Sequence, residues 1–217
     1  MIAGATLPDW LQDLDERVFL SLNGALHDGW AGFEDVLSCF NGLGNAFLLV
    51  PLLAALLVLS GSLRSFARRA VEVGVSQAVA APVVTWLKSG IGRARPSVVL
   101  ADAFADGHAS LAFGENGGSG SMPSGHAVTV FAFATVLAWW AGALAPGWRR
   151  TLGRVLPFVL AAVTGVARVY AGMHFPLDVV AGALLGTALA LAGLVLVRVV
   201  ASVYRDDDAD RSRRGTY

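Results

Sequence analysis

Residues 174–197 read HFPLDVVAGALLGTALALAGLVLV, and this stretch decides the fold. No Asp, Glu, Lys or Arg occurs between Asp178 and the end of the stretch, so the run is long enough to cross a bilayer as one helix. His174 and Asp178 stand directly before this uncharged run. The stretch therefore predicts a membrane-spanning helix with polar residues gathered at one of its ends, where such residues are candidates for function.

Four further runs without charged residues occur along the chain: 45–63, 73–87, 127–148 and 155–167. The two shorter runs, 73–87 and 155–167, span only if the charged residues at their ends lie at the membrane interfaces or face protein. The chain of 217 residues is 55% hydrophobic and only 15% charged, which excludes an ordinary soluble domain. We predict an all-α protein, a polytopic transmembrane helical bundle with five to six spans.

The first part of the chain, residues 1–42, has a different pattern. Apolar side chains recur there at intervals of three and four, with charged ones mostly between them: Trp10, Leu11, Leu14, Val18, Leu22 and Leu26. This spacing predicts an N-terminal amphipathic helix that lies on the membrane or packs beside the bundle. Asn23-Gly24 is expected to form a turn, and a second short helix is expected over 33–40. Whether 10–40 supply the sixth span stays open.

Basic residues gather in two connections, 60–70 and 147–154, and the positive-inside rule places both in the cytoplasm. Alternation of the spans then puts 92–124 and the turn at 171–176 on the extracytoplasmic side. The connection 97–122 is rich in Gly, Ala and Ser, and it is either a lid or an irregular loop. We expect one membrane-embedded domain over 1–204, followed by a charged, disordered cytoplasmic tail over 205–217.

Composition also narrows the possible partners. The formal net charge of zero gives no reason to expect nucleic acid as a partner. The single cysteine, Cys39, excludes an internal disulfide framework, and no His/Cys cluster suggests a structural metal. Glu72 is expected to pair with Arg68 or Arg69, while His27 and His108 are expected at the surface.

The first group of residues that suggests chemistry is KSGIGRARP, residues 88–96. Lys88 and Arg95 are nearly two helical turns apart, so a continuous helix would carry both on one face. Pro96 disfavours helix at Arg95 and is expected to end the element there. The two cations would point to one place near the membrane surface. The alternative is that they only anchor the helix at the interface.

The second group is MPSGH, residues 122–126, directly before an apolar run. A helix N-terminus offers free backbone N–H groups and the positive end of the helix dipole, and so it binds phosphate readily. Gly125 permits a close approach of the backbone, and Ser124 adds a hydroxyl. His126 would stand in the first turn, where it could deliver a proton. The alternative is a helix cap followed by a surface histidine.

The third group is RVYAGMHFPLD, residues 168–178. His174 and Asp178 lie one turn apart, so on one helix the carboxylate can accept the imidazole N–H and raise the nucleophilicity of the ring. Pro176 fits the first turn of that helix, and Gly172 lets the chain turn before it. The planar fork of Arg168 suits two phosphate oxygens. The alternative is an interfacial ion pair between His174 and Asp178.

The order and spacing of the three groups resemble the type 2 phosphatidic acid phosphatase superfamily. That superfamily includes polyprenyl diphosphate phosphatases, glucose-6-phosphatase and vanadium haloperoxidases. The resemblance covers residues 88–178. One departure is Ala167, where family members often have Ser; Arg168, which follows it, is expected to carry the phosphate contact.

The resemblance implies a role for each residue. His174 attacks phosphorus and forms a phospho-histidine, Asp178 orients His174, and His126 protonates the leaving oxygen and then activates water. The remaining matched positions hold the phosphate oxygens: Lys88, Arg95, Ser124, Gly125 and Arg168. The family needs no metal or other cofactor. Three cations and a helix N-terminus agree with this, because phosphoryl transfer depends mostly on positioning and on stabilising charge at the equatorial oxygens.

The resemblance also implies a substrate class. We expect a lipid phosphatase of the bacterial inner (cytoplasmic) membrane, with its active site on the extracytoplasmic side. Candidate substrates are undecaprenyl diphosphate, phosphatidic acid and phosphatidylglycerol phosphate, of which the first suits an outward-facing site and a small chain. The alternatives are a phosphotransferase with the same site and a vanadate-binding haloperoxidase; the apolar spans disfavour the latter, because those enzymes are soluble.

A third alternative is a non-enzymatic membrane protein, either a small transporter or an assembly scaffold. The last span is rich in small residues, which permits close helix packing and is compatible with a homodimer: Gly182, Ala183, Gly186, Ala188, Ala190 and Gly193. Replacing His174 by Ala separates this alternative from an enzyme, because only the enzyme would lose its activity.

Overall fold

The structure is a computed structural model that describes residues 7–27, 63–112, 120–142 and 146–214. The described ranges form helices and no strands. The helices are α1 (Asp9–His27), α4 (Leu63–Ile91), α5 (Pro96–Val99), α6 (Ala101–Ala105), α7 (Gly125–Ala141), α8 (Trp148–Tyr170) and α9 (Pro176–Arg214). The expectation of an all-α fold is therefore confirmed for these ranges, while the expected span over 45–63 and the expected helix over 33–40 lie outside the described residues.

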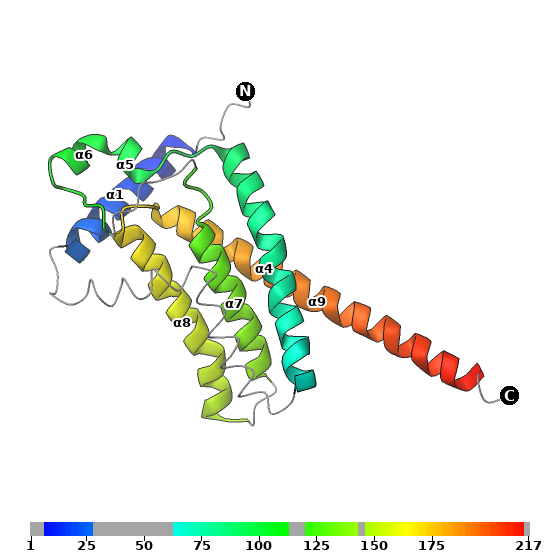
Figure 1. Cartoon of the computed structure of the whole chain (residues 1–217). Coiled ribbons are helices and arrows are strands. Elements are labelled where there is room, and N and C mark those ends of the chain that lie inside the picture. Colours follow the sequence, from blue (N-terminus) through cyan, green and yellow to red (C-terminus); the bar gives the residue numbers. More distant parts are fainter. Residues whose placement is uncertain (1–6, 28–62, 113–119, 143–145, 215–217) are drawn as a thin grey trace.

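Helix α7 is the centre of the bundle, and it packs mainly against α9 and α8 while α4 covers the α7–α9 pair (Figure 1). Its composition explains this place, because a helix that is apolar all round is stable only when neighbours or lipid surround it. The core between the helices includes Val136 of α7, Val73 of α4 and Leu194 of α9. Contacts with the small residues of α9 let α7 approach closely.

Three helical stretches of the described chain are long and apolar enough to cross a membrane: Ala67–Ala105, Trp148–Tyr170 and Pro176–Val203. Helix α7 is apolar but shorter. The expected span 127–148 was too long, because α7 ends at Ala141 and Trp148 already begins α8. At about 1.5 Å per residue, α7 is slightly shorter than a bilayer core of about 30 Å.

Of the four charged residues that bound the two shorter runs, Glu72 and Arg168 face protein, whereas Lys88 is half-buried and Arg154 is exposed. Glu72 is buried, where it accepts a hydrogen bond from Trp140 and pairs with Arg68 as expected. Arg168 is also buried, in the last turn of α8. Because these charges face protein rather than lipid, the short runs 73–87 and 155–167 can lie inside longer membrane helices.

The N-terminal helix α1 lies across one end of the bundle, near α5 and α6 (Figure 1). The side chains it directs into the protein are Asp15, Phe19 and Asn23, spaced one turn apart, all of which are buried. The apolar row at Trp10, Leu14, Val18 and Leu22 is exposed instead. A turn at Asn23-Gly24 was a wrong expectation, because α1 continues to His27 and Asn23 bonds to other segments rather than to its own turn.

Two further expectations need correction. The connection 97–122 is not wholly irregular, since α5 and α6 occupy its first part, with Pro96 as the first residue of α5. The tail 205–217 is not simply disordered, since α9 continues to Arg214. No Gly or Pro interrupts the chain between Gly193 and Gly215, so no backbone breaker ends the helix where the apolar run stops.

Candidate active site

The three sequence groups come to the same end of the bundle, beneath α1, α5 and α6 (Figure 1). The first group begins in the last turn of α4 and continues beyond its end, the second forms the N-terminus of α7, and the third joins α8 to α9. Lys88 and Arg95 are not on one continuous helix as proposed from the sequence. Helix α4 ends at Ile91 because Gly92 takes a positive φ of 62°, and the chain then crosses the end of the bundle to Pro96.

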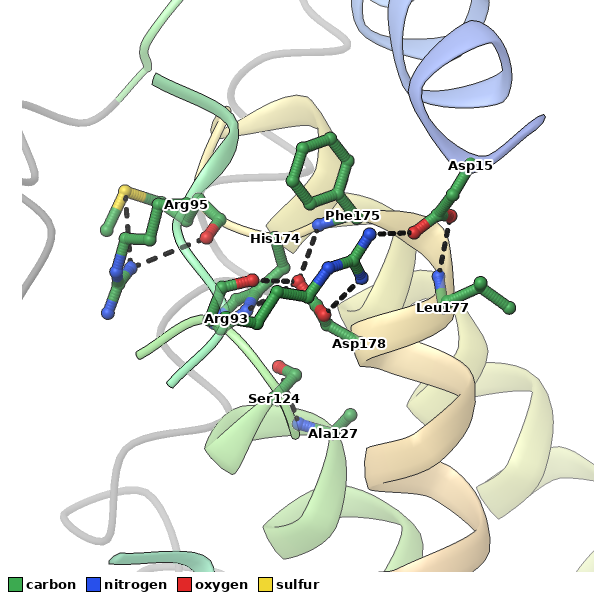
Figure 2. A network of polar contacts seen from close by, with 11 residues as sticks. Asp15, Arg93, Arg95, Ser124, Ala127, His174, Phe175, Leu177 and Asp178 are labelled. Atoms are coloured by element: carbon green, nitrogen blue, oxygen red, sulfur yellow. Dashed lines mark hydrogen bonds and ion pairs between the residues drawn. The ribbon is translucent and has the colours of Figure 1, made fainter. Parts of the chain in front are cut away.

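Asp178 accepts hydrogen bonds from three donors in this site (Figure 2). Its Oδ2 accepts the backbone N–H of Phe175 at 2.9 Å, as a carboxylate in the first turn does in a capping box. The hydroxyl of Ser121 donates to the same oxygen, and Arg93 Nη1 donates to Oδ1 at 2.7 Å. With its side chain fully buried, Asp178 is held in one orientation by groups from three different segments.

His174 is buried in the turn before α9, and its Nδ1 lies 3.7 Å from Asp178 Oδ2. This distance is too long for a hydrogen bond, and Nδ1 has no hydrogen-bond partner in the structure. Catalytic hydrogen bonds are often long before substrate binds. Burial lowers the pKa of His174 from its ordinary value, Arg168 and Lys88 lower it further, and Asp178 opposes them. This lowered pKa favours the neutral ring at neutral pH, and the neutral ring is the form that can act as a nucleophile.

The three predicted phosphate-binding cations lie around this ring. Lys88 and Arg168 both act electrostatically on His174. Arg95 Nη1 is 3.4 Å from the carbonyl oxygen of Met173, the residue next to His174. Lys88 and Arg95 are half-buried, so their charges are not fully screened by water, and together with buried Arg168 they create a positive site for an anion.

The second group forms the N-terminus of α7 as expected. Ser124 is the N-cap: its side chain accepts the backbone N–H of Ala127 at 3.5 Å, and its own N–H donates to the carbonyl of Asp178 at 2.9 Å. This second bond ties the beginning of α7 to the first turn of α9. Gly125 and His126 follow in the first turn of α7 and are half-buried.

Sequence reasoning missed Arg93 and Asp15. The two nitrogens at the tip of Arg93 donate to two carboxylates, Nη1 to Asp178 and Nη2 to Asp15, each at 2.7 Å (Figure 2). The Arg93 guanidinium also lies 4.4 Å from the centre of the Phe175 ring. Burial raises the pKa of Asp15, although the bonds from Arg93 and from the Leu177 N–H work against that rise.

Asp15 also caps α9, because its Oδ1 accepts the backbone N–H of Leu177 in the first turn of this helix at 3.0 Å. The signal in the sequence was the position of Asp15 one turn before Phe19 and two turns before Asn23. A polar–aromatic–polar row on one helical face indicates burial against polar groups, but the exposed apolar row dominated the pattern. Ser121 was missed as well, and no local signal could have found its bond to Asp178.

Among the described residues, no three or more His, Cys, Asp or Glu side chains gather as a metal site. The arrangement instead brings together a neutral buried imidazole, a fixed carboxylate beside it, several cations and a helix N-terminus. These are the parts that bind a phosphate group and attack it.

Fold and site together define the class of integral membrane phosphatases. The chain belongs to the PAP2 superfamily, whose family model matches residues 69–201, more than half of its length. The family resemblance stated from the sequence is therefore confirmed. Among curated proteins, none matches this chain.

Two solved structures share the fold. One is LpxE of Aquifex aeolicus, with 25% identity, a TM-score of 0.66, and coverage of 89% of this chain and 99% of that chain. The other is a transmembrane PAP2-type phosphatidylglycerolphosphate phosphatase from Bacillus subtilis, with 21% identity, a TM-score of 0.68, and coverage of 89% of both chains. Both likenesses extend over nearly the whole chain, so the fold includes the ends of the bundle as well as the matched family region.

Proposed function

We propose that this chain removes a phosphate from a membrane lipid through a phospho-histidine at His174. The observation that carries the proposal is the buried His174 beside a fully buried Asp178, with Lys88 and Arg168 acting electrostatically on the same ring. In the proposed reaction, the ring attacks phosphorus while the P–O bond to the lipid breaks. His126 gives its proton to the leaving oxygen and then takes one from water, which hydrolyses the P–N bond and releases phosphate.

The phosphate would be held by Lys88, Arg95, Arg168 and the N-terminus of α7 at Ser124 and Gly125. Their charges suit the three equatorial oxygens of a transferring phosphoryl group. The substrate class follows from the surroundings, since the site lies where α4 ends and where α7 and α9 begin. A lipid with its chains in the bilayer and its phosphate at the boundary fits this position. Undecaprenyl diphosphate, phosphatidic acid and phosphatidylglycerol phosphate are the substrates we propose to compare.

The decisive experiment is phosphate release by purified protein in detergent from these three lipids, with His174→Ala as the blank. Its matched control is His108→Ala, which changes an exposed histidine of the same end of the molecule. We expect release from at least one lipid, near-complete loss in His174→Ala and unchanged release in His108→Ala. No release from any of the three, with folded protein, would refute the proposal; transfer of phosphate to an added lipid alcohol instead of water would identify a phosphotransferase.

The proposed orientation is extracytoplasmic for the active site. Support comes from Arg68, Arg154 and Arg198, which lie at the other end of the bundle, as the positive-inside rule requires of the cytoplasmic end. Single cysteines test this in a Cys39→Ser background: Asp106→Cys at the active-site end and Thr151→Cys at the basic end, both exposed positions. In intact spheroplasts, a membrane-impermeant maleimide should label only Asp106→Cys; labelling of only Thr151→Cys would reverse the orientation.

A further inference from the structure

A second hollow lies at the end of the bundle away from the proposed active site. It has a volume of about 760 Å³, and helices α4, α7, α8 and α9 all contribute to its walls. Four arginines and two tryptophans line it: Arg68, Arg69, Arg154, Arg198, Trp139 and Trp140. We call it the basic cavity. Its volume falls in the range of small-molecule sites, which is about 300–1,000 Å³.

Arg69 of the basic cavity is half-buried and the other three arginines are exposed, but several of them have fixed partners. Trp140 donates its Nε1 to Glu72 at 2.6 Å, and the same carboxylate, with 1% of its side chain exposed, pairs with Arg68 at 3.4 Å. The guanidinium of Arg69 lies 5.3 Å from the Trp140 ring centre, and that of Arg198 lies 4.2 Å from the Trp139 ring centre. Buried Glu72 and the two indoles therefore hold Arg68, Arg69 and Arg198 in place.

The charge of the basic cavity calls for an anion. None of the described residues that line it is acidic, whereas four of them are arginines; Glu72, which pairs with Arg68, lies behind its wall. Like charges gathered beside apolar helices repel one another more strongly than they do in water. Interfacial anchoring explains why a single arginine lies at a membrane boundary. It does not explain why α4, α8 and α9 direct arginines to one hollow.

The position of the basic cavity indicates what kind of anion it receives. Arg68 and Lys88 belong to the same helix, and their separation along it is about 30 Å, the thickness of a bilayer core. A neighbouring hollow of about 720 Å³ shares Arg68 and Arg198, and its other lining residues are Glu72 of α4 and Val197, Val199, Ala201 and Ser202 of α9. A phosphate at the arginines would thus have apolar space beside it for an acyl chain.

We propose that the basic cavity binds the phosphate group of an anionic phospholipid in the leaflet opposite the proposed active site. Arginine suits this ligand because its planar fork donates two parallel hydrogen bonds to phosphate oxygens, and Trp139 and Trp140 suit the headgroup level of a membrane. The basic cavity uses none of the residues of the proposed reaction, so a failure of the proposed reaction would not refute lipid binding here.

The test is native mass spectrometry of the full chain in detergent with equal amounts of phosphatidylglycerol and phosphatidylcholine. We expect the wild type to retain phosphatidylglycerol preferentially. The double variant Arg154→Gln/Arg198→Gln should weaken its binding by about tenfold or more, the effect of losing at least one charge-assisted contact. The matched control is Arg149→Gln, which removes the same charge at the same end but does not line the basic cavity.

Two additions keep the test decisive. Arg198→Lys keeps the charge but loses the fork, and it should bind more tightly than Arg198→Gln and more weakly than the wild type. Melting temperature and phosphate release by each variant show whether it is folded. Equal retention of both lipids by the wild type, or an equal loss in Arg149→Gln, would overturn the proposal. A third outcome would overturn the lipid as the source of the phosphate group. In that outcome, inorganic phosphate stabilises the protein in a way that depends on Arg198, and the wild type shows no preference for phosphatidylglycerol.

Discussion

Arg93 Nη1 donates to Oδ1 of Asp178 at 2.7 Å, and this bond joins the segment after α4 to the first turn of α9. The other terminal nitrogen of Arg93 bonds Asp15 of α1 at the same distance. One guanidinium therefore bridges two carboxylates whose side chains are 1% and 0% exposed. Without the cation, each carboxylate would be a buried charge with fewer partners, so α1 and α9 are held together through Arg93.

The first prediction concerns this bridge. Arg93→Ala should destabilise the protein by about 3–5 kcal/mol, because it leaves two buried carboxylates without their cation. For a chain of this size that lowers the melting temperature in detergent by about 10 °C. Activity should fall as well, since Asp178 loses one of the groups that orient it. Arg93→Lys should be intermediate, because one ammonium cannot reproduce the fork. The control is Arg17→Ala on the exposed face of α1, and an equal loss there would contradict the bridge.

The second prediction concerns pH. Burial lowers the pKa of His174, so between that lowered pKa and about 6.5 the unfolded chain binds more protons than the folded one. Stability then rises with pH across this window and is lost as pH falls below about 6.5. Melting temperatures of the wild type should therefore fall more steeply on acidification than those of His174→Gln. Asp15, whose pKa burial raises, contributes the opposite slope to both proteins, so the difference between them reports on His174 together with the carboxylate of Asp178 beside it.

The pH dependence of activity also reports on the protonation of His174. If neutral His174 is the nucleophile, kcat/KM falls on acidification as the ring becomes protonated. The midpoint of this fall should lie below about 6.5, the ordinary pKa of histidine. A midpoint above that value in the wild type would contradict a buried neutral ring.

What the sequence could predict depends on whether a relationship is local. His174 and Asp178 are one helical turn apart, so their neighbourhood followed from spacing alone. The N-cap at Ser124 and the start of α9 at Pro176 followed from local rules as well. Arg93 and Asp15 meet only because the bundle brings α1 over the active-site end, and no spacing along the chain encodes that contact.

Hydrophobic periodicity predicted that α1 is a helix but not which of its faces is buried. Its apolar row indicated an amphipathic helix at the right place, but the row is exposed, and the buried face carries Asp15 and Asn23. In a membrane protein, an exposed apolar row can face lipid, and polar side chains can face protein where they complete its hydrogen bonds. The rule that apolar residues face the core therefore does not choose between the two faces. That α1 lies on the membrane stays a prediction.

The third prediction concerns Asn23, which is fully buried. Its side-chain amide donates to the carbonyls of Val169, Tyr170 and Ser110, and its oxygen accepts the N–H of Ser110. The first two carbonyls belong to the last turn of α8, where helix carbonyls lack partners of their own. Asn23→Leu should cost at least about 3 kcal/mol, because several buried groups lose their partner. The measurement is the melting temperature in detergent.

The control for Asn23 is Ser21→Ala on the exposed side of α1, where the hydroxyl only bonds its own helix. It should leave the melting temperature nearly unchanged. Asn23→Asp keeps the acceptor but loses the donors, and it should lie closer to Asn23→Leu than to the wild type. A melting temperature of Asn23→Leu equal to that of Ser21→Ala would show that α1 is not fixed through this residue.

The fourth prediction concerns the close approach of α9 to α7. A Cβ at Gly186 would lie 2.2 Å from the carbonyl oxygen of Val128, and one at Gly182 would lie 2.6 Å from that of Ser124. Both neighbours are backbone atoms, so the helices must move apart. A Cβ at Gly193, by contrast, meets nothing closer than 3.6 Å. Alanine at Gly193 should therefore stabilise the helix slightly, by up to about 1 kcal/mol, while the same change at Gly186 should destabilise the bundle.

Gly182→Ala separates packing from chemistry, because the atom it displaces belongs to the N-cap of α7. The shift moves the helix N-terminus that we propose to bind phosphate, and a misplacement of about 1 Å near a reacting group can reduce a rate about a hundredfold. Gly182→Ala should therefore lose more activity than Gly186→Ala for a comparable fall in melting temperature, and Gly193→Ala should lose neither. Melting temperature and phosphate release measured on the three variants check this order. Equal activity in Gly182→Ala and Gly193→Ala would mean that the position of the α7 N-terminus does not limit the reaction.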